Sequence, residues 1–374
     1  MNSLQPSVLD LQMTVKTVLV DAREFVPGKT TGIGRFLEGL VGALTDADPN
    51  MDIVLASFRN NSVPKKLFEK RTELKQLPSG LLSSERALSN LTKHNVSLFL
   101  SPYPKIPLFG TYCLTVNTVH DVFEFTLPTY EKRLRRMIDR YRLRQALNQA
   151  SLTWYVSEWS LQETLRYFGI VGKDPRVRHS AIHPRFNVGK SAWDHAVLKK
   201  YDLLPGYILL VGNGLPHKNL GVLLKIAPIL SREIVIVGVP QENQRRWRQA
   251  YPQAQPTWIE YVEDDHLPAI MRHALCLTQP STAEGYGFPP LEAMACGVPV
   301  VVSDIPVLLE CTGGNALTAD PQDSKLWQTT IESLDDSDTY HIQVKKGLEW
   351  VEPLRGSEGW ERHIMDIQEL LSPR

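Results

Sequence analysis

Short runs of aliphatic and β-branched residues alternate along the chain with longer segments of mixed polarity. In the first half, these runs predict buried strands over 15–20, 53–58, 97–100, 113–119 and 152–156. In the second half they recur over 207–211, 233–237, 257–261, 274–278 and 298–302. Helices are expected between them. Alternation of this kind is typical of parallel sheets covered by helices, so the sequence predicts an α/β protein.

The alternation pauses between residues 184 and 206, which divides the pattern into two similar halves. A chain of 374 residues also exceeds one typical domain. We therefore expect two Rossmann-like domains, at residues 1–190 and 191–355. Segment 356–374 follows them, and Trp360, Ile364, Ile367 and Leu371 there share one face of a predicted amphipathic helix.

Composition excludes several classes of protein. Lys plus Arg and Asp plus Glu both number 41, which gives no basis for nucleic-acid binding. No apolar run approaches the roughly 18 residues of a membrane-spanning helix, and the first residues lack the basic and apolar regions of a signal peptide. The four cysteines are scattered, with no close pair at metal-ligand spacing. We expect a reduced, cytoplasmic protein.

The most informative stretch runs from residue 283 to residue 302 and predicts a loop, a helix and a strand. Gly285 and Gly287 allow a ligand to approach the loop backbone closely. The loop precedes a helix N-terminus, where free N–H groups and the helix dipole favour an anion. Glu284 and Glu292 flank this site. Because carboxylates repel a phosphate, we expect them to accept hydrogen bonds from sugar or ribose hydroxyls.

Glu284 and Glu292, seven residues apart and separated by Gly-Tyr-Gly-Phe-Pro-Pro, resemble the signature of retaining nucleotide-sugar glycosyltransferases of family 4 (group 1). The resemblance implies the GT-B architecture: two Rossmann-like domains face each other across a cleft, and the last helix crosses back to the first domain. It also implies that Glu284 binds donor-sugar hydroxyls and acts in catalysis, and that Glu292 holds the ribose. The backbone that contacts the sugar and the diphosphate would be that of Gly285, Tyr286, Gly287 and Phe288.

Two further glycine-containing segments are candidates for phosphate binding. Residues 212–219 follow the first strand of the second half, and Gly212, His217 and Lys218 are the donor-binding candidates there. In many similar mannosyltransferases an arginine occupies the position of His217, and histidine lacks its bidentate fork. In the first half, Gly32 and Gly34 lie in a predicted glycine-rich loop that would face the donor diphosphate and the acceptor.

Four other residues gain a role from the resemblance. His120 ends a predicted strand, where open α/β sheets bind ligands, and it would contact the donor sugar as a catalytic residue. The adjacent Asp121 is the candidate for acceptor binding. Tyr261 and Val262 match the segment whose backbone meets the nucleotide base.

A metal site is not expected. Asp46 and Asp48, and likewise Asp336 and Asp338, form Asp-x-Asp motifs, but both pairs lie in polar stretches away from strand ends. No His/Cys cluster has zinc spacing. We expect Lys218 and helix dipoles to neutralise the leaving diphosphate instead.

Residues 130–149 form a basic segment with helical spacing. Two interpretations stay open: a solvated helix face, or a surface for an anionic membrane or a phosphorylated lipid acceptor. The second would place the protein peripherally at the inner face of the membrane. The cations are Lys132, Arg133, Arg135, Arg136, Arg140, Arg142 and Arg144.

The sequence thus predicts a metal-independent, retaining hexosyltransferase that acts on a glycan or lipid-linked acceptor in surface polysaccharide or glycolipid synthesis. Mannose from GDP-mannose is favoured, because residues 31–36, His120 and residues 217–219 resemble mannosyltransferases of such pathways. Two alternatives remain: a nucleotide-sugar 2-epimerase of the same fold, and a catalytically silent protein that binds sugar nucleotides.

Overall fold

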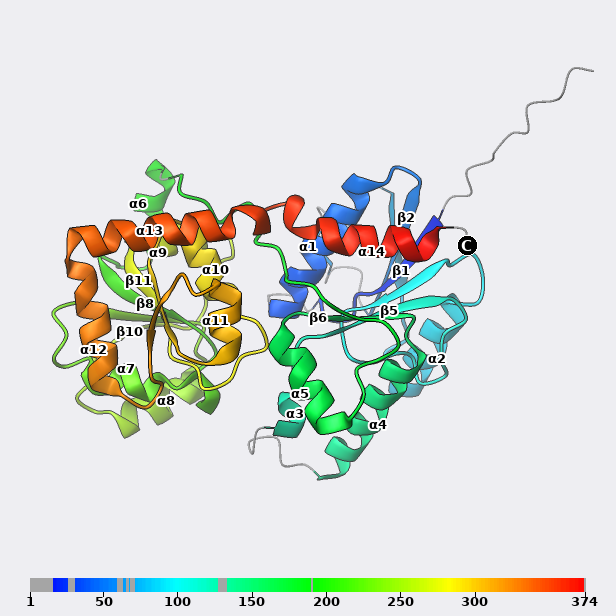
Figure 1. Ribbon diagram of the computed structural model, residues 1–374, viewed down its shortest axis with the longest axis horizontal. Helices are drawn as coiled ribbons and strands as arrows, with labels where there is room; N and C mark the ends of the chain where they lie inside the picture. Colours follow the sequence, from blue (N-terminus) through cyan, green and yellow to red (C-terminus); the bar gives the residue numbers. More distant parts are fainter. Residues whose placement is uncertain are drawn as a thin grey trace, which may run out of the picture.

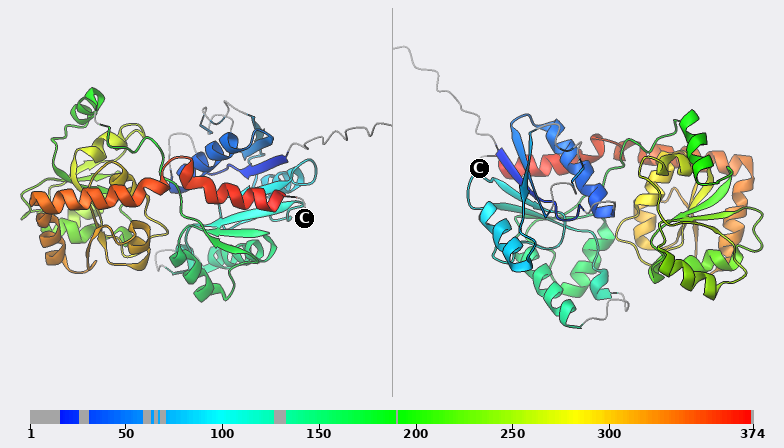
Figure 2. Two further views of the ribbon diagram at one scale, coloured as in Figure 1. Left: turned by 45° about the horizontal axis from the view of Figure 1, so that its top comes forward. Right: turned by 180° about the vertical axis from the view of Figure 1, so that it is seen from behind.

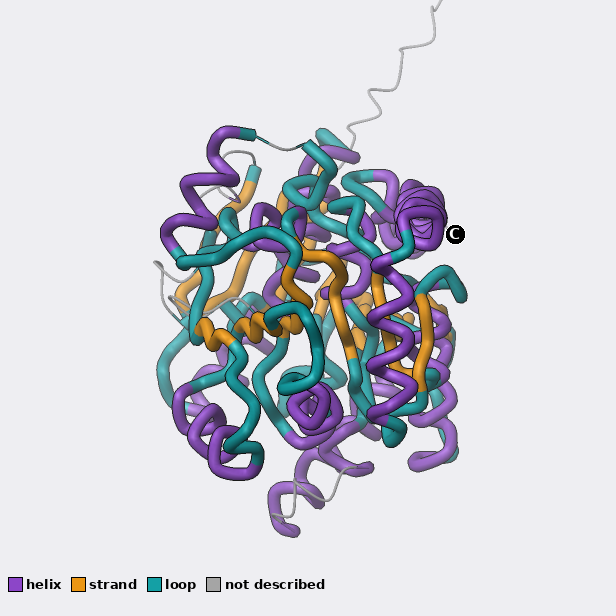
Figure 3. The backbone as a smooth tube through the Cα atoms, turned by 90° about the vertical axis from the view of Figure 1, so that its left-hand side faces the viewer, coloured by secondary structure: helices purple, strands orange, loops and turns teal. Residues whose placement is uncertain are grey.

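The computed structural model describes residues 16–25, 31–58, 63, 64, 67, 71–126, 133–189 and 191–372. It contains two parallel sheets, which lie in two lobes arranged side by side along the long axis (Figure 1). Viewed from behind, each lobe has its own sheet and its own helices (Figure 2). Viewed along the long axis, helices surround the strands (Figure 3).

The first lobe is built on a seven-stranded sheet in the order β3-β2-β1-β4-β5-β6-β7. The strands are β1 (Lys16–Asp21), β2 (Met51–Ser57), β3 (Thr72–Gln76), β4 (Leu98–Ser101), β5 (Leu114–Val119), β6 (Leu152–Tyr155) and β7 (Pro175–Val177). The helices are α1 (Gly32–Ala47), α2 (Leu81–Leu91), α3 (Phe123–Thr126), α4 (Arg133–Gln149) and α5 (Glu158–Phe168). The strand order reverses between β1 and β4, as in a Rossmann-type sheet.

The second lobe is built on a six-stranded sheet in the order β10-β9-β8-β11-β12-β13. The strands are β8 (Tyr207–Val211), β9 (Ile234–Val237), β10 (Thr257–Ile259), β11 (Ala274–Gln279), β12 (Val300–Ser303) and β13 (Leu317–Ala319). The helices are α6 (Ala192–Lys200), η2 (Pro216–Lys218), α7 (Leu220–Ile226), α8 (Gln241–Ala250), α9 (Leu267–Arg272), α10 (Phe288–Ala295), α11 (Pro306–Thr312), α12 (Ser324–Glu332), η3 (Ser333–Asp335) and α13 (Ser337–Val351).

Alternating side chains of the central strands build a core on each face of each sheet. In the first lobe, Val18 and Val20 of β1 pack with Phe36 of α1, whereas Leu19 packs with Leu88 of α2 on the opposite face. The central strand of the second lobe, β8, alternates in the same way. Strands buried on both faces explain the continuous apolar runs in the sequence.

The C-terminal segment joins the two lobes. Helix α13 packs on α10 in the second lobe, and the chain then passes through η4 (Glu352–Leu354) and η5 (Glu358–Trp360) into α14 (Glu361–Leu371) (Figure 1). Helix α14 packs on α1 in the first lobe. There Asp366 accepts hydrogen bonds from the indole of Trp154 and from Arg178, each at 2.8 Å. The predicted return of the last helix to the first domain is confirmed.

The ten predicted strands agree with the structure to within two residues at either end. Three strands were not predicted: β3, β7 and β13. All three lie at the edge of a sheet and are only partly buried, so their sequences carry no continuous apolar run. Helix α6 lies within the stretch where the alternation pauses.

The glycine-rich loop predicted around Gly32 and Gly34 is wrong in one respect: both glycines lie in the first turn of α1. Thr31 is the N-cap, and its hydroxyl accepts a hydrogen bond from the Gly34 amide at 3.0 Å. This cap starts the helix earlier than the glycines suggest. The preceding residues of the predicted loop, 27–30, lie outside the described residues.

Candidate active site

Two strands that are neighbours in the second sheet each place a predicted donor-binding residue at the same edge. The chain leaves β8 through Gly212 and reaches Lys218 in η2, and it leaves β11 to reach Glu284. The strand order reverses between β8 and β11, which is where open α/β sheets bind ligands. The Nζ of Lys218 donates to Oε1 of Glu284 at 2.7 Å.

Glu284 is a buried carboxylate held by several donors. Besides Lys218, the Ser281 hydroxyl donates to it at 2.6 Å, and the Gln279 amide also donates to it. Burial by itself raises the pKa of Glu284, but Lys218 and these hydrogen bonds outweigh it, and the pKa is lowered. Glu284 is therefore an anion with a fixed orientation, suited to accepting hydrogen bonds from hydroxyl groups.

The loop after Glu284 contacts the first lobe directly. A Cβ atom added to Gly285 would lie 2.6 Å from the His120 carbonyl oxygen, so no side chain fits there. The Ser157 hydroxyl donates to the Gly285 carbonyl at 2.9 Å. Gly287 has a φ of +135° and is the N-cap of α10. These contacts bring His120 and Asp121 to the donor-binding candidates of the second lobe.

His120 is neutral near pH 7. Burial lowers its pKa to about 4, and its Nε2 is buried without a hydrogen-bond partner among the described residues. Its ring packs edge-on against Phe36, with the centroids 5.1 Å apart. The adjacent Asp121 accepts a hydrogen bond from the Phe123 amide at 3.0 Å. A neutral imidazole with an unused nitrogen can hydrogen-bond to a sugar hydroxyl.

Phe123 and His217 join the two lobes at the same place, with ring centroids 5.5 Å apart. The pKa of His217 is lowered by burial and by the Lys218 ammonium. His217 is therefore a neutral hydrogen-bonding group and not a substitute for a charged arginine.

Glu292, predicted to hold the ribose, lies in α10 and pairs with a residue of the first lobe. Nη1 of Arg35, in α1, donates to Oε1 of Glu292 at 2.7 Å, and its Nη2 lies 3.6 Å from Asp264. The other carboxylate oxygen of Glu292, Oε2, is buried and has no partner among the described residues. Burial raises the pKa of Glu292, and Arg35 offsets part of this effect. Arg35 was not among the site residues predicted from the sequence, although it lies near the start of the helix after β1.

The remaining predicted donor-binding residues surround these pairs. Gly32 lies against Phe288, since a Cβ on Gly32 would be 3.8 Å from the Phe288 ring. Tyr286 is buried, and its hydroxyl donates to the Ser180 carbonyl at 3.2 Å, so its backbone is the part available to a ligand. Tyr261 and Val262 follow β10; Tyr261 is exposed and Val262 is buried.

Two cavities adjoin the loop between Glu284 and Glu292. One, of about 280 Å³, has Arg35 and Arg185 in its lining together with Asp264, Phe288 and Glu292. The other, of about 200 Å³, lies between the first lobe and residues 283–285, and its lining includes Asp121, Trp159 and Glu284. Both cavities have walls from both lobes, which defines a cleft between them.

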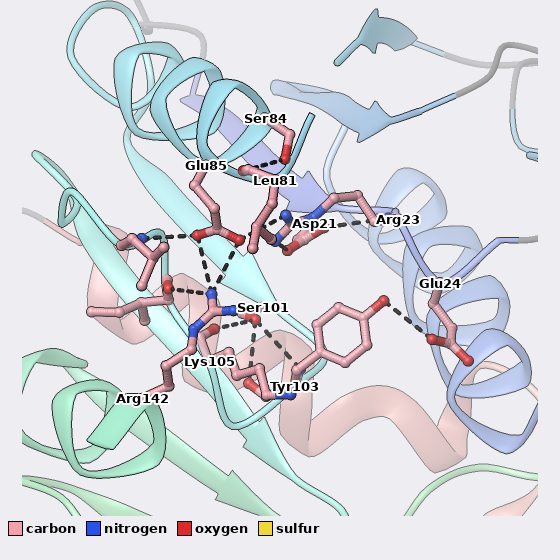
Figure 4. Close-up of polar contacts among 12 residues, drawn as sticks. Asp21, Arg23, Glu24, Leu81, Ser84, Glu85, Ser101, Tyr103, Lys105 and Arg142 are labelled. Carbon is pink, nitrogen blue, oxygen red and sulfur yellow. Dashed lines mark hydrogen bonds and ion pairs between the residues drawn. The ribbon is translucent and has the colours of Figure 1, made fainter. Parts of the chain in front are cut away.

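A third polar cluster lies in the first lobe at the carboxyl ends of β1 and β4 (Figure 4). Glu85 is buried and accepts from Arg23 at 2.9 Å and from Arg142 at 3.0 Å. Tyr103 donates to Glu24 at 3.2 Å. Arg142 therefore points into the lobe and does not contribute to an exposed face of the basic segment.

Within the part of the chain that the structure describes, no group of three or more His, Cys, Asp or Glu side chains is arranged to hold a metal ion. The Asp-x-Asp motifs lie at helix ends, where Asp48 is the C-cap of α1 and Asp336 is the N-cap of α13.

Comparison with known proteins shows what the chain is similar to. Residues 200–350 match the family model described as Glycosyl transferases group 1. O-antigen chain mannosyltransferase B of Escherichia coli is 32% identical over 245 residues, which cover 62% of this chain and 64% of that protein. O-antigen chain mannosyltransferase RfbU of Salmonella typhimurium is 26% identical over 247 residues, which cover 64% of this chain and 65% of the relative. The chain thus spans slightly less than two thirds of these relatives.

Solved structures with the same arrangement of lobes include the sucrose-phosphate synthase of Thermosynechococcus elongatus, with a TM-score of 0.74 and 17% identity over 95% of this chain and 98% of that one. WaaG, a glycosyltransferase involved in lipopolysaccharide biosynthesis, has a TM-score of 0.70 and 13% identity over 94% of this chain and 99% of that one.

Residues 200–350 are therefore a glycosyl transferases group 1 domain, and the two lobes have the GT-B fold of glycosyltransferases. The fold class predicted from the sequence is confirmed, and the match of residues 200–350 agrees with the predicted family.

Proposed function

We propose that this chain is a glycosyltransferase that moves mannose from GDP-mannose to a hydroxyl group of a glycan or lipid-linked acceptor in the synthesis of a surface polysaccharide. The observation that carries the proposal is the convergence of Lys218, Glu284 and His120 at one edge of the cleft. The two O-antigen mannosyltransferases that the chain resembles favour mannose and a polysaccharide product.

The proposed roles follow from the chemistry of each side chain. Lys218 supplies positive charge to the leaving diphosphate, together with the amides at the start of α10. Glu284 accepts hydrogen bonds from hydroxyls of the mannosyl group, and neutral His120 binds another of them. Glu292 binds the ribose. Asp121, at the wall of the smaller cavity, contacts the acceptor.

We propose transfer with retention of the anomeric configuration and without a metal ion. The bond between the anomeric carbon and the phosphate oxygen breaks, and a bond from the same carbon to the acceptor oxygen forms on the same face. The acceptor proton passes to the departing phosphate. Lys218 carries the positive charge that would offset the leaving diphosphate. The same charge lowers the pKa of the neighbouring Glu284.

Two other functions would use the same fold. A nucleotide-sugar 2-epimerase would produce an isomerised sugar, and a silent protein would bind sugar nucleotides without turnover. The transferase is favoured because the O-antigen relatives are mannosyltransferases by name and because Lys218 pairs with Glu284 next to the loop that contacts His120.

We also propose contact with an anionic membrane through α4. Met137, Ile138 and Tyr141 on this helix are exposed apolar side chains, and Arg140 lies one residue before Tyr141. A mixed apolar and basic helix face binds anionic interfaces. No helix among the described residues is long and apolar enough to cross a membrane.

Co-sedimentation with phosphatidylglycerol vesicles tests the contact through α4. We expect the wild type to sediment with the vesicles and the double variant Met137→Ser/Tyr141→Ser to stay in solution. Equal sedimentation of the variant would refute the contact.

The donor is tested by a thermal-shift screen of the purified chain against GDP-mannose, UDP-glucose and ADP-glucose. Bound ligand raises the unfolding temperature according to its concentration relative to Kd. We expect GDP-mannose to give the largest increase. A larger increase with UDP-glucose or ADP-glucose would reject GDP-mannose as the donor.

A further inference from the structure

The Phe36 ring of α1 connects His120 to the C-terminal segment. Its centroid lies 5.1 Å from that of the His120 ring, with the two ring planes at 90°. It also lies 5.3 Å from the centroid of the Trp360 ring, at 74°. Both contacts have the edge-to-face geometry that aromatic rings prefer. Phe36 is fully buried and Trp360 is 4% exposed, so ring contacts run without a break from the last segment of the chain to the predicted catalytic histidine.

Trp360 is itself closely packed. It is the last residue of η5 and precedes α14, in the segment that returns from the second lobe. A Cβ atom on Gly39 of α1 would lie 2.7 Å from the indole ring, so Trp360 meets α1 where only a glycine fits. His363 of α14 packs against both rings, with its centroid 4.9 Å from that of Trp360 and 5.9 Å from that of Phe36. The position of the Phe36 ring is therefore set by the C-terminal segment as well as by α1.

Hydrogen bonds alone leave the orientation of His120 incompletely fixed. Its Nε2 is buried and has no hydrogen-bond partner among the described residues. The backbone of Pro102 forms a hydrogen bond with the imidazole. Because proline has no N–H, its carbonyl accepts and the ring donates. Since Nε2 has no partner, Nδ1 is the donor, and Nε2 of the neutral ring is left as an acceptor. One hydrogen bond still allows the ring to tilt about it, so the direction of Nε2 also depends on what packs against the ring.

We propose that Phe36 is a positioning residue: held by Trp360, its ring keeps the His120 imidazole in the orientation in which Nε2 accepts a hydrogen bond from the donor sugar. This proposal rests on the proposed function, in which His120 binds a sugar hydroxyl. It gives the returning C-terminal segment a part in turnover besides joining the lobes. Misplacing a reacting group by about 1 Å costs about 100-fold in rate, so an apolar contact behind His120 can control kcat.

Binding and kinetics of the full chain separate positioning from packing. Titration calorimetry with GDP and with GDP-mannose, and kcat for GDP release from GDP-mannose, would be compared in wild type and Phe36→Leu. GDP lacks the sugar that His120 is proposed to bind, so its affinity should be unchanged. GDP-mannose should bind more weakly, and kcat should fall by about 10-fold or more.

Phe99→Leu is the matched control. Phe99 is a fully buried aromatic residue of β4, and it belongs to the core cluster on the opposite face of the sheet from Phe36. The same substitution there removes a comparable ring from the same lobe. Phe99→Leu should therefore lower the stability measured by urea unfolding without changing kcat.

NMR of protein labelled with ¹⁵N-histidine follows the His120 ring itself, and His120→Gln assigns its signals. Burial lowers the pKa of His120 to about 4 in the wild type, so the ring should stay largely neutral between pH 7 and pH 5. Loss of the Phe36 ring admits water, and in Phe36→Leu the pKa should rise toward about 6.5. Trp360→Leu should raise it less. The titratable groups nearest to this contact are Asp121, the next residue in the chain, and His363, whose pKa of about 3 lies below the range measured.

If either kcat or the titration of His120 is unchanged in Phe36→Leu, the positioning role is overturned. An equal loss of kcat in Phe99→Leu would also overturn it, because destabilisation alone would then explain the loss. Trp360 lines the larger cavity as well, so only its effect on His120 is compared. If Phe36→Leu does not fold, a His120 pKa that stays at about 4 in Trp360→Leu overturns the proposal. Wild-type protein that binds neither GDP nor GDP-mannose would reject the proposed function, while the titration would still decide whether Phe36 fixes the imidazole.

Discussion

The Nζ atom of Lys218 lies 2.7 Å from Oε1 of Glu284, so the cation expected to bind the diphosphate and the carboxylate expected to bind the sugar form one buried ion pair. Lys218 lowers the pKa of Glu284 against the opposing effect of burial. A change at either residue should therefore affect both donor binding and the ionisation of the site.

Lys218→Ala should weaken donor binding by roughly 10- to 150-fold, the contribution of a charged hydrogen bond to phosphate. It should also move the acid limb of the kcat/KM profile to higher pH, because the pKa of Glu284 rises once its ammonium partner is gone. Titration calorimetry and a pH series would measure both effects. Lys225→Ala, at an exposed position of α7, is the control. Unchanged donor affinity would remove Lys218 from the site.

The two glutamates should differ in kinetics. A contact with the reacting sugar strengthens as charge develops, whereas a ribose contact is the same before and during reaction. Glu284→Gln should therefore lower kcat more than it raises KM, and Glu292→Gln should mainly raise KM for the donor. Steady-state kinetics with one donor would decide. If both variants lose only kcat, or if the pattern is reversed, the assigned roles are wrong.

His363 in α14 should make the protein less stable in acid. It is buried among Phe36, Trp154 and Trp360, and its pKa is lowered to about 3 by burial. Since an unfolded histidine has a higher pKa, the unfolded state binds the proton first, and stability falls as the pH drops below about 6.5. At pH 5 the loss should reach about 2 kcal/mol.

His363→Phe should abolish this part of the acid destabilisation, measured by urea unfolding at pH 7 and pH 5. His341→Phe, at an exposed position, is the control and should leave the pH dependence unchanged. If wild type and His363→Phe lose the same unfolding free energy between pH 7 and pH 5, the expected role of His363 is contradicted.

Transfer should continue in excess EDTA, because Lys218 and the start of α10 provide the positive charge proposed for the leaving diphosphate. The measurement is the initial rate with and without chelator, after treatment that removes bound metal. Activity that disappears with EDTA and returns with magnesium or manganese would show that the proposed charge balance is incomplete.

The sequence predicted the central strands well because each is buried on both faces and forms a continuous apolar run, as Tyr207–Val211 does. The edge strand Thr72–Gln76 was missed because its charged residues lack that signal. Glu284, Glu292, Lys218 and His120 could be proposed as site residues because each follows a strand or a glycine-containing loop in a recognisable motif.

Contacts between the lobes could not be predicted from the sequence. Arg35 and Glu292 are separated by 257 positions, and nothing in either segment indicates that they meet. The same holds for Glu310, which accepts hydrogen bonds from the Glu158 and Trp159 amides at the start of α5. Such pairs depend on how two separately folded sheets are placed, which local patterns do not determine.

The central claim is mannosyl transfer from GDP-mannose, and the most direct test follows GDP release in the presence and absence of a mannose-terminated glycan acceptor. We expect slow GDP release without acceptor. With acceptor, GDP release should be faster, and an acceptor product one hexose longer should form. Glu284→Gln should give little product. An isomerised sugar, whether free or still linked to the nucleotide, would contradict mannosyl transfer. So would GDP-mannose that stays intact with every acceptor while UDP-glucose is consumed.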